Sequence, residues 1–287
     1  MRRPNIIQKE TEQIETVEDL TGVFESLATT QIAKVKDKVE TSKDFFDLLW
    51  SKYSAIRVDP KSRITQREDV YKTKQAFVVI SAEAGLSGDI DLRLVEAVLH
   101  DYDPKTTDII VVGSHGAQQL KQREVIYSRF FKVPESDNYI DVSPVIKSIE
   151  PYKQVKVYYE QYVSIGVQNI ATIDLIQSIK TMSEDTEDGE NIISEIDTIF
   201  EPSLDEIADI METAMMSFAF SQVILESGLA QDASRFNAMA VAKKRAMELV
   251  DLYKLEYHRS KRSDNDRQMR EVMVSLKRKK RSNSNVR

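Results

Sequence analysis

The sequence lacks or is poor in the residues that support covalent, metal and membrane chemistry. It has no cysteine and three histidines, which excludes disulfides and thiol nucleophiles and leaves little for a metal site. Its 8 glycines and 7 prolines are too few for a turn-dense sandwich or barrel. No apolar run approaches the about 20 residues that cross a bilayer, and the N-terminus turns acidic, unlike a signal peptide. We therefore expect long helices in a cytoplasmic chain without a transmembrane segment.

The charges are segregated along the chain, which has a formal net charge of −7. Residues 10–33 contain six acidic and no basic residues, and residues 181–234 contain fourteen acidic and no basic residues. Residues 235–287 contain sixteen Lys and Arg against six acidic residues. The acidic balance excludes a chain that is basic throughout, as a general nucleic-acid binder would be. An acidic beginning and a basic end predict that the two ends pair.

The first 58 residues have the pattern of one long amphipathic helix. Apolar residues recur at spacings of three, four or seven from Ile14 to Ile56. Gly22 is the only helix breaker between Ile14 and Pro60. Residues 1–58 are therefore predicted to form a helix of about 50 residues, roughly 80 Å long at 1.5 Å per residue.

A second long helix is predicted over residues 203–277. Ser203 and Glu206, which follow a proline, have the spacing of a capping box that satisfies the first free amides of a helix. A helix of about 110 Å needs a helical partner. Antiparallel packing on the first helix places acidic residues 10–33 beside the nine basic residues of 243–270. The two ends therefore predict a long antiparallel two-helix coiled coil.

The middle of the chain predicts a small α/β domain. Residues 76–80 and 108–112 are short apolar runs typical of buried parallel strands, and a helix-like stretch follows each. This βαβ order predicts a Rossmann-like α/β domain with a parallel sheet, inserted between the two long helices. The further expected elements are helices at 90–101 and 117–123 and strands at 155–159 and 163–167. The predicted domains are 1–58, 70–182 and 203–277, followed by a basic tail at 278–287.

Two loops of the α/β domain suggest chemistry but have simpler interpretations. Residues 83–88 lie between a strand and a helix, where phosphates are often bound. The loop lacks the Walker lysine, and Glu83 would repel phosphate, so an ordinary βα turn is favoured. Ser114 and His115 are adjacent and lack the base and orienting group of a catalytic triad. His115 is therefore interpreted as a loop histidine.

Three further patterns also favour structural interpretations. The acidic residues of 181–212 lack EF-hand spacing and are expected on a solvated face. Met211, Met215 and Met216 are expected to pack in a core or helix seam. The basic segment from Lys277 to Arg281 could contact nucleic acid or anionic lipid, but such tails are common without that function. No catalytic residue, cofactor site or metal site is predicted.

The last helix resembles a known family. Residues 226–242 read ESGLAQDASRFNAMAVA. This is similar to the signature E-S-x-x-[AS]-E-x-x-A-R-x-x-A-M-x-x-A of the gamma subunit of F-type ATP synthases, of the bacterial type. The segment from Phe77 to Gly88 is similar to the family's strand and its following G-L-C-G-G-x-N. The order of N-terminal helix, α/β domain and C-terminal helix also matches that family.

The resemblance implies a rotating shaft without catalytic groups. Such a central stalk couples proton flow through the membrane ring to ATP synthesis or hydrolysis in a hexamer of alpha and beta subunits. The implied partners are the alpha, beta and epsilon subunits and the membrane c-ring, with no direct nucleic acid. The implied location is peripheral, on the cytoplasmic face of the bacterial cell membrane. The residues implied to contact partners are Arg235, Asn237, Met239, Arg259 and Glu271.

The chain departs from the family pattern at both ends. His258, Arg262 and Asp266 stand where the family has Asn, Gln and Thr, which indicates altered contacts between the upper shaft and the hexamer. One alternative is therefore a gamma-like shaft of a specialised rotary ATPase that is not driven by proton flow. A second alternative is a non-enzymatic coiled-coil adaptor whose basic tail binds nucleic acid.

Overall fold

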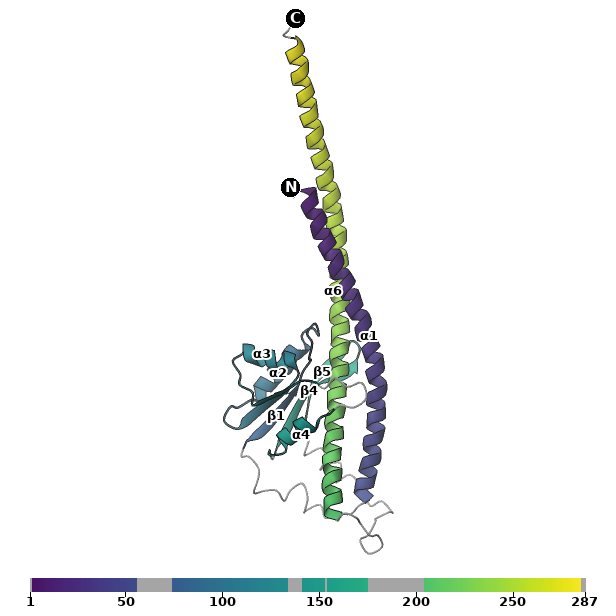
Figure 1. Ribbon diagram of the computed structural model, residues 1–287, viewed down its shortest axis with the longest axis vertical. Helices are drawn as coiled ribbons and strands as arrows, with labels where there is room; N and C mark the ends of the chain where they lie inside the picture. Colours follow the sequence, from purple (N-terminus) through teal and green to yellow (C-terminus); the bar gives the residue numbers. More distant parts are fainter. Residues whose placement is uncertain (1, 56–73, 134–140, 153, 175–203, 285–287) are drawn as a thin grey trace. The chain divides into compact units, whose positions relative to one another are not determined.

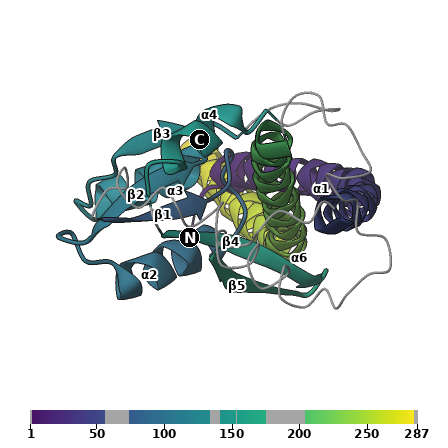
Figure 2. The ribbon, with the colours of Figure 1, turned by 90° about the horizontal axis from the view of Figure 1, so that it is seen from below.

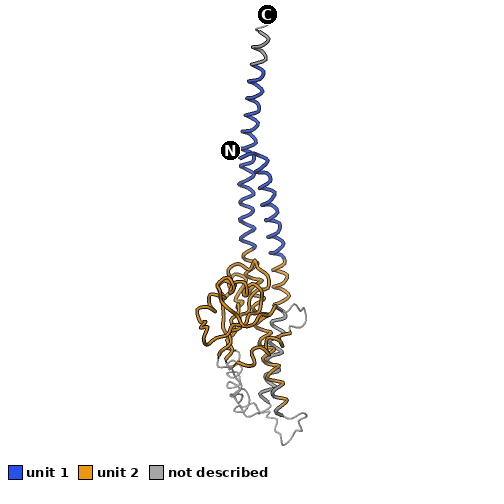
Figure 3. The backbone as a smooth tube through the Cα atoms, turned by 60° about the vertical axis from the view of Figure 1, so that its left-hand side comes forward, with its two compact units in different colours: residues 1–26, 239–287 blue, residues 27–238 orange. Residues whose placement is uncertain are grey.

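The structure is a computed structural model that describes residues 2–55, 74–133, 141–152, 154–174 and 204–284 of the 287-residue chain. It contains two long helices, α1 (Pro4–Ala55) and α6 (Leu204–Ser284), and an α/β portion between them (Figure 1). The chain divides into two compact units, residues 1–26 with 239–287 and residues 27–238 (Figure 3). The α/β fold class with long terminal helices is confirmed. The predicted domain bounds stay a prediction.

In the first unit α1 and α6 pack antiparallel, with acidic residues of one helix against basic residues of the other. Lys243 Nζ lies 3.1 Å from Glu25 and Lys254 Nζ lies 2.8 Å from Glu15. Ser260 Oγ donates to the carbonyl oxygen of Arg2, just before α1, at 2.7 Å. Later residues of α6 (243, 254 and 260) contact earlier residues of the N-terminal segment (25, 15 and 2), so the helices run in opposite directions. The predicted pairing of the acidic and basic ends is confirmed within this unit.

The second unit contains a five-stranded sheet with the order β3-β2-β1-β4-β5. The strands are β1 (Gln75–Ile80), β2 (Thr107–Val112), β3 (Arg129–Phe131), β4 (Val155–Ser164) and β5 (Val167–Asp174). The first four run parallel, whereas β5 pairs antiparallel with β4. The sheet is therefore mixed. The predicted parallel pairing of 76–80 with 108–112 is confirmed, and β3 was not predicted.

The strand predicted at residues 163–167 is wrong. β4 continues to Ser164, Ile165 and Gly166 lie in a turn, and β5 begins at Val167. Val163, Ile165 and Val167 are about half exposed. They lie at the turn of the β4–β5 hairpin, and their alternation does not indicate a buried strand face. A period of two continues across a tight turn, and the pattern alone does not show where the chain reverses.

Helices cover both faces of the sheet. One face carries α2 (Ile90–Asp101) and α3 (Ser114–Gln122), whose Leu94, Val98 and Leu120 pack against β1 and β2. The other carries α4 (Ser143–Ile149) and α6, which contributes Phe220 and Val223. Figure 2 shows α2 and α4 on opposite sides of the strands. α6 is thus anchored to the sheet by a buried apolar face.

Other predictions have mixed outcomes. Met215 is fully buried and Met216 packs against the core, which confirms their packing role. His115 lies in the first turn of α3, so its placement in a loop is wrong. α6 continues as a helix through the basic segment 277–281 to Ser284. Ser203, Pro60 and most of the acidic segment lie outside the described residues. No helix among the described residues is long and apolar enough to cross a membrane.

Candidate functional site

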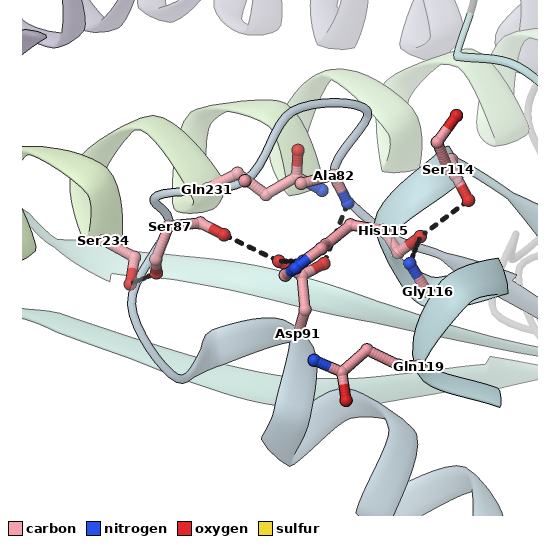
Figure 4. Close-up of polar contacts among 12 residues, drawn as sticks. Ala82, Ser87, Asp91, Ser114, His115, Gly116, Gln119, Gln231 and Ser234 are labelled. Carbon is pink, nitrogen blue, oxygen red and sulfur yellow. Dashed lines mark hydrogen bonds and ion pairs between the residues drawn. The ribbon is translucent and has the colours of Figure 1, made fainter. Parts of the chain in front are cut away.

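A buried polar cluster lies where β1 and β2 end, the edge of a parallel sheet at which α/β proteins usually hold functional groups (Figure 4). At its centre is Asp91, in the first turn of α2, whose side chain is fully buried. Its Oδ1 accepts a hydrogen bond from the Ala82 amide at 2.9 Å. Its Oδ2 accepts from Ser87 Oγ at 2.7 Å and lies 2.9 Å from His115 Nδ1. A carboxylate only accepts, so His115 carries a proton on Nδ1.

Glu83 holds the beginning of α3. Its carboxylate accepts hydrogen bonds from the Ser114 hydroxyl, from the Ser114 amide at 3.2 Å and from the Val133 amide at 3.2 Å. An acidic group suits a helix N-terminus because the first amides have no partner within the helix. Ser114 and His115 are thus bound to different carboxylates. They do not form a nucleophile and base pair.

The turn that leads into α3 also needs close contact with the end of β1. Gly113 has φ of 104°, a backbone conformation that residues with a Cβ rarely adopt. A Cβ at Gly113 or Gly116 would collide with Ser81, whose buried hydroxyl accepts from the Gly116 amide at 2.9 Å. The glycines therefore let α3 begin directly against β1, which brings His115 to Asp91.

α6 brings three polar side chains to the cluster from one of its faces. Ser227, Gln231 and Ser234 are spaced by four and three residues, the spacing of one helical face. Ser234 Oγ donates to the Ser87 carbonyl at 2.6 Å. Ser227 Oγ lies 3.2 Å from Glu160 Oε2 and accepts from Gln231 Nε2 at 3.1 Å. These hydrogen bonds hold α6 on the sheet in addition to its apolar packing.

Glu160, on β4, is the second fully buried carboxyl group of the cluster. Burial, and next the neighbouring Asp91 carboxylate, raise the pKa of Glu160 well above its ordinary value. Its Oε1 has no hydrogen-bond partner among the described residues. Within the described ranges no group of three His, Asp or Glu residues could hold a metal ion. The cluster is suited to fixing elements in place, because its hydrogen bonds join α2, α3, β4 and α6.

The five predicted interface residues divide into two groups. Three have contacts inside the chain: Arg235 binds Asp232 and reaches the Gly85 carbonyl, Asn237 donates to the Ile165 carbonyl, and Met239 is buried. The other two, Arg259 and Glu271, are exposed on the last part of α6. The role of all five as partner contacts stays a prediction.

Comparison with known proteins identifies the family. The ATP synthase family, ATP-synt, matches residues 5–275. The chain belongs to this family. It is 23% identical over 277 residues to an ATP synthase gamma chain of Staphylococcus epidermidis, covering 91% of this chain and 94% of that one. It is 23% identical over 289 residues to the ATP synthase gamma chain of Pelagibacter ubique, covering 93% and 96%.

Solved structures of the family share the fold. The rotor of the Euglena gracilis mitochondrial ATP synthase matches with a TM-score of 0.62 and 16% identity, over 90% of this chain and 98% of that one. A chain of the OSCP/F1/c-ring assembly from the same organism matches with a TM-score of 0.64 and 13% identity, over 95% and 94%. At these identities the likeness shows the fold.

Sequence reasoning missed the buried cluster. Four of its members stand at positions where the resembled motifs have another residue: Gln231 for Glu, Ser234 for Ala, Ser87 for Cys and Asp91 for Asn. These departures were the available signal, because a motif position that changes to a different hydrogen-bonding group needs a new partner. Glu160 has no such signal, since an acidic residue in a strand gives no indication of its burial.

Proposed function

We propose that this chain is the gamma subunit, the rotating central stalk, of an F-type ATP synthase. The observation that carries the proposal is the match to gamma chains over more than nine-tenths of both chains. The antiparallel pairing of α1 with α6 suits a shaft, and the α/β portion inserted between them in the sequence (residues 74–174) suits the part of a stalk that is called its foot. The chain has no catalytic role of its own and is a part of an enzyme complex whose chemistry takes place in other subunits.

The shaft acts by presenting different faces to its partners. As it rotates inside a hexamer of alpha and beta subunits, each beta subunit meets a different side of the α1–α6 pair. Unequal interaction energies then favour open or closed nucleotide sites in turn. Proton flow through the c-ring drives the rotation, and the epsilon subunit binds the foot. The complex places this chain peripherally on the cytoplasmic face of the bacterial cell membrane.

The five interface residues have two proposed roles. Arg259 and Glu271 are exposed and charged, so they are proposed to contact the hexamer directly. Arg235, Asn237 and Met239 are proposed to act through packing, because each is already engaged within the chain. Arg235 and Asn237 hold α6 to loops of the α/β portion, where torque would pass between foot and shaft.

Co-expression with the alpha and beta subunits of the same organism tests the proposal. The expected result is a complex with one copy of this chain per hexamer, measured by size-exclusion chromatography with light scattering. The purified chain is expected to hydrolyse no ATP. A hexamer that excludes this chain, or ATP hydrolysis by the chain alone, would overturn the proposal.

A second candidate is the gamma-like shaft of a specialised rotary ATPase. It is favoured by the ends of the chain, because α6 continues helical through the basic segment 277–281 and α1 carries acidic residues early. Purification of the native complex and identification of its membrane partners distinguish the two candidates. A proton-conducting c-ring supports the ATP synthase, and a different membrane partner supports the specialised motor.

A further inference from the structure

Asp91 and Glu160 form a pair of buried carboxyl groups with unequal surroundings. Both side chains have no exposed surface. Asp91 has three donors, the Ala82 amide, the Ser87 hydroxyl and His115 Nδ1. Glu160 is engaged by the side chains of Ser227 and Gln231, both from α6, and it also lies against the Asp91 carboxylate. Its Oε1 accepts no hydrogen bond from a donor among the described residues. Burial, and next the neighbouring Asp91 carboxylate, disfavour the charged form of Glu160, so Glu160 is the group that retains a proton.

The elements around Glu160 supply little to compensate a second charge. α6 contributes the uncharged Ser227 and Gln231, and its nearby Glu226 is bonded to Gln161 instead. α2 contributes Asp91 and α3 contributes His115, which faces Asp91. In β5 the residue paired with Glu160 is Ile170. Among the described residues, no lysine or arginine forms an ion pair with either carboxyl group.

We propose that Glu160, Asp91 and Ser227 are positioning residues that fix α6 on the sheet, and that they do so only while Glu160 is protonated. Loss of the proton places two negative charges side by side in a buried site, which is relieved when α6 shifts from the sheet or water enters. The inference concerns contacts within residues 27–238 and goes beyond the proposed function, so it holds for any partner of the chain.

The pH dependence has a definite sign. The pKa of Glu160 is raised in the folded chain above its ordinary value of 4.5, so the folded state binds more protons than the unfolded state above that pH. The contribution of Glu160 to stability is therefore fully present below about pH 4 and falls as pH rises, until the carboxyl group ionises in the folded state. Over that window the folding equilibrium constant falls about tenfold per pH unit.

The first measurement is urea unfolding of the full chain between about pH 5 and pH 9, the range in which most proteins are stable. The stability of the parent chain is expected to fall relative to Glu160→Gln as pH rises, because the amide keeps the shape without the proton. Glu96→Gln, at an exposed position of α2, is the matched control and should follow the parent. His115→Asn should keep the pH response. Parallel profiles for parent and Glu160→Gln, or loss of the response in His115→Asn, would overturn the proposal.

The second measurement reports position directly. Because the chain has no cysteine, Ile126→Cys and Ile210→Cys, at positions 84% and 63% exposed, accept a pair of spin labels within the second unit. The distance distribution between the labels is expected to be narrow at low pH and to broaden at high pH in the parent. It should stay narrow in Glu160→Gln. A pH-dependent stability difference with unchanged distances at every pH would reject the positioning role.

Discussion

At the scale of single residues, the buried cluster depends on donors and acceptors that match one by one. Asp91 receives a backbone amide, a hydroxyl and an imidazole, and Glu83 caps α3. Each buried polar atom left without a partner costs about 1–3 kcal/mol. The arrangement also requires the close approach of α3 to β1 at Gly113 and Gly116.

Gly113→Ala tests that close approach. An alanine at this position would have a strained φ of 104°, and its Cβ would collide with the Ser81 carbonyl. We therefore expect a loss of more than about 1 kcal/mol in the free energy of unfolding. Urea unfolding monitored by circular dichroism measures the loss. Gly166→Ala is the control, since nothing lies within 4 Å of a Cβ there. Equal effects of the two substitutions would contradict the role of the close approach.

Arg259→Ala tests the proposed contact with the hexamer. Arg259 is exposed on α6, so the isolated variant should keep its helical content and unfolding temperature. Assembly with alpha and beta subunits, or the coupling of ATP hydrolysis to proton pumping, should weaken. Lys244→Ala, another exposed basic position of α6, is the control. If Arg259→Ala instead unfolds the isolated chain and assembly is otherwise normal, the residue has a structural role.

At the scale of elements, charge determines how α1 and α6 pair within the first unit. Glu15 and Lys254 are 2.8 Å apart, and both side chains are partly exposed. The side-chain hydrogen bond to Glu15 raises the pKa of Lys254. Exposed pairs contribute little to stability, so they favour one register of the helices while the buried apolar residues stabilise the pair.

Replacing Glu12, Glu15 and Glu18 by Lys tests the pairing. The unfolding temperature should fall more at about 0.01 M salt than at about 1 M, because the Debye length shortens from about 30 Å to about 3 Å. Differential scanning calorimetry measures both. Adding Lys254→Glu should restore part of the loss at low salt, because it recreates the Glu15 pair with reversed charges. Equal losses at both salt concentrations would mean that the acidic face contacts something other than α6.

At the scale of the whole molecule, both compact units draw on the same two helices. The first unit consists of the beginning of α1 and the end of α6, and the second contains the rest of both helices together with the sheet. Neither long helix has a core of its own, because an isolated amphipathic helix is marginally stable in water. The chain is therefore expected to fold only when both ends are present.

Excision of residues 203–276 tests that dependence. The remaining N-terminal segment should lose most of its helical signal per residue, as measured by far-ultraviolet circular dichroism. Addition of the separate 203–276 peptide should restore part of the signal. Full helicity of the truncated chain would show that α1 is stable without α6.

The sequence by itself determined the two long helices, the first strands of the sheet and the pairing of the ends. Spacings of three and four residues and segregated charges can be read along the sequence, so α1, α6 and the pairing of the acidic segment 10–33 with the basic segment 243–270 could be predicted. The individual pair of Glu25 with Lys243 came from the structure. The parallel strands β1 and β2 could be predicted from their short apolar runs. The family signature lies within a single helix and could therefore be recognised as a resemblance.

The tertiary structure alone decided the buried cluster and the edge of the sheet. Glu160 and Ser227 are 67 positions apart, and Ser87 and Ser234 are 147 apart. No local pattern shows that such residues meet, because their contact depends on which face of α6 lies on the sheet. The antiparallel β5 and the position of His115 in α3 follow from the same cause: a turn or cap takes its form from partners that are distant in the sequence.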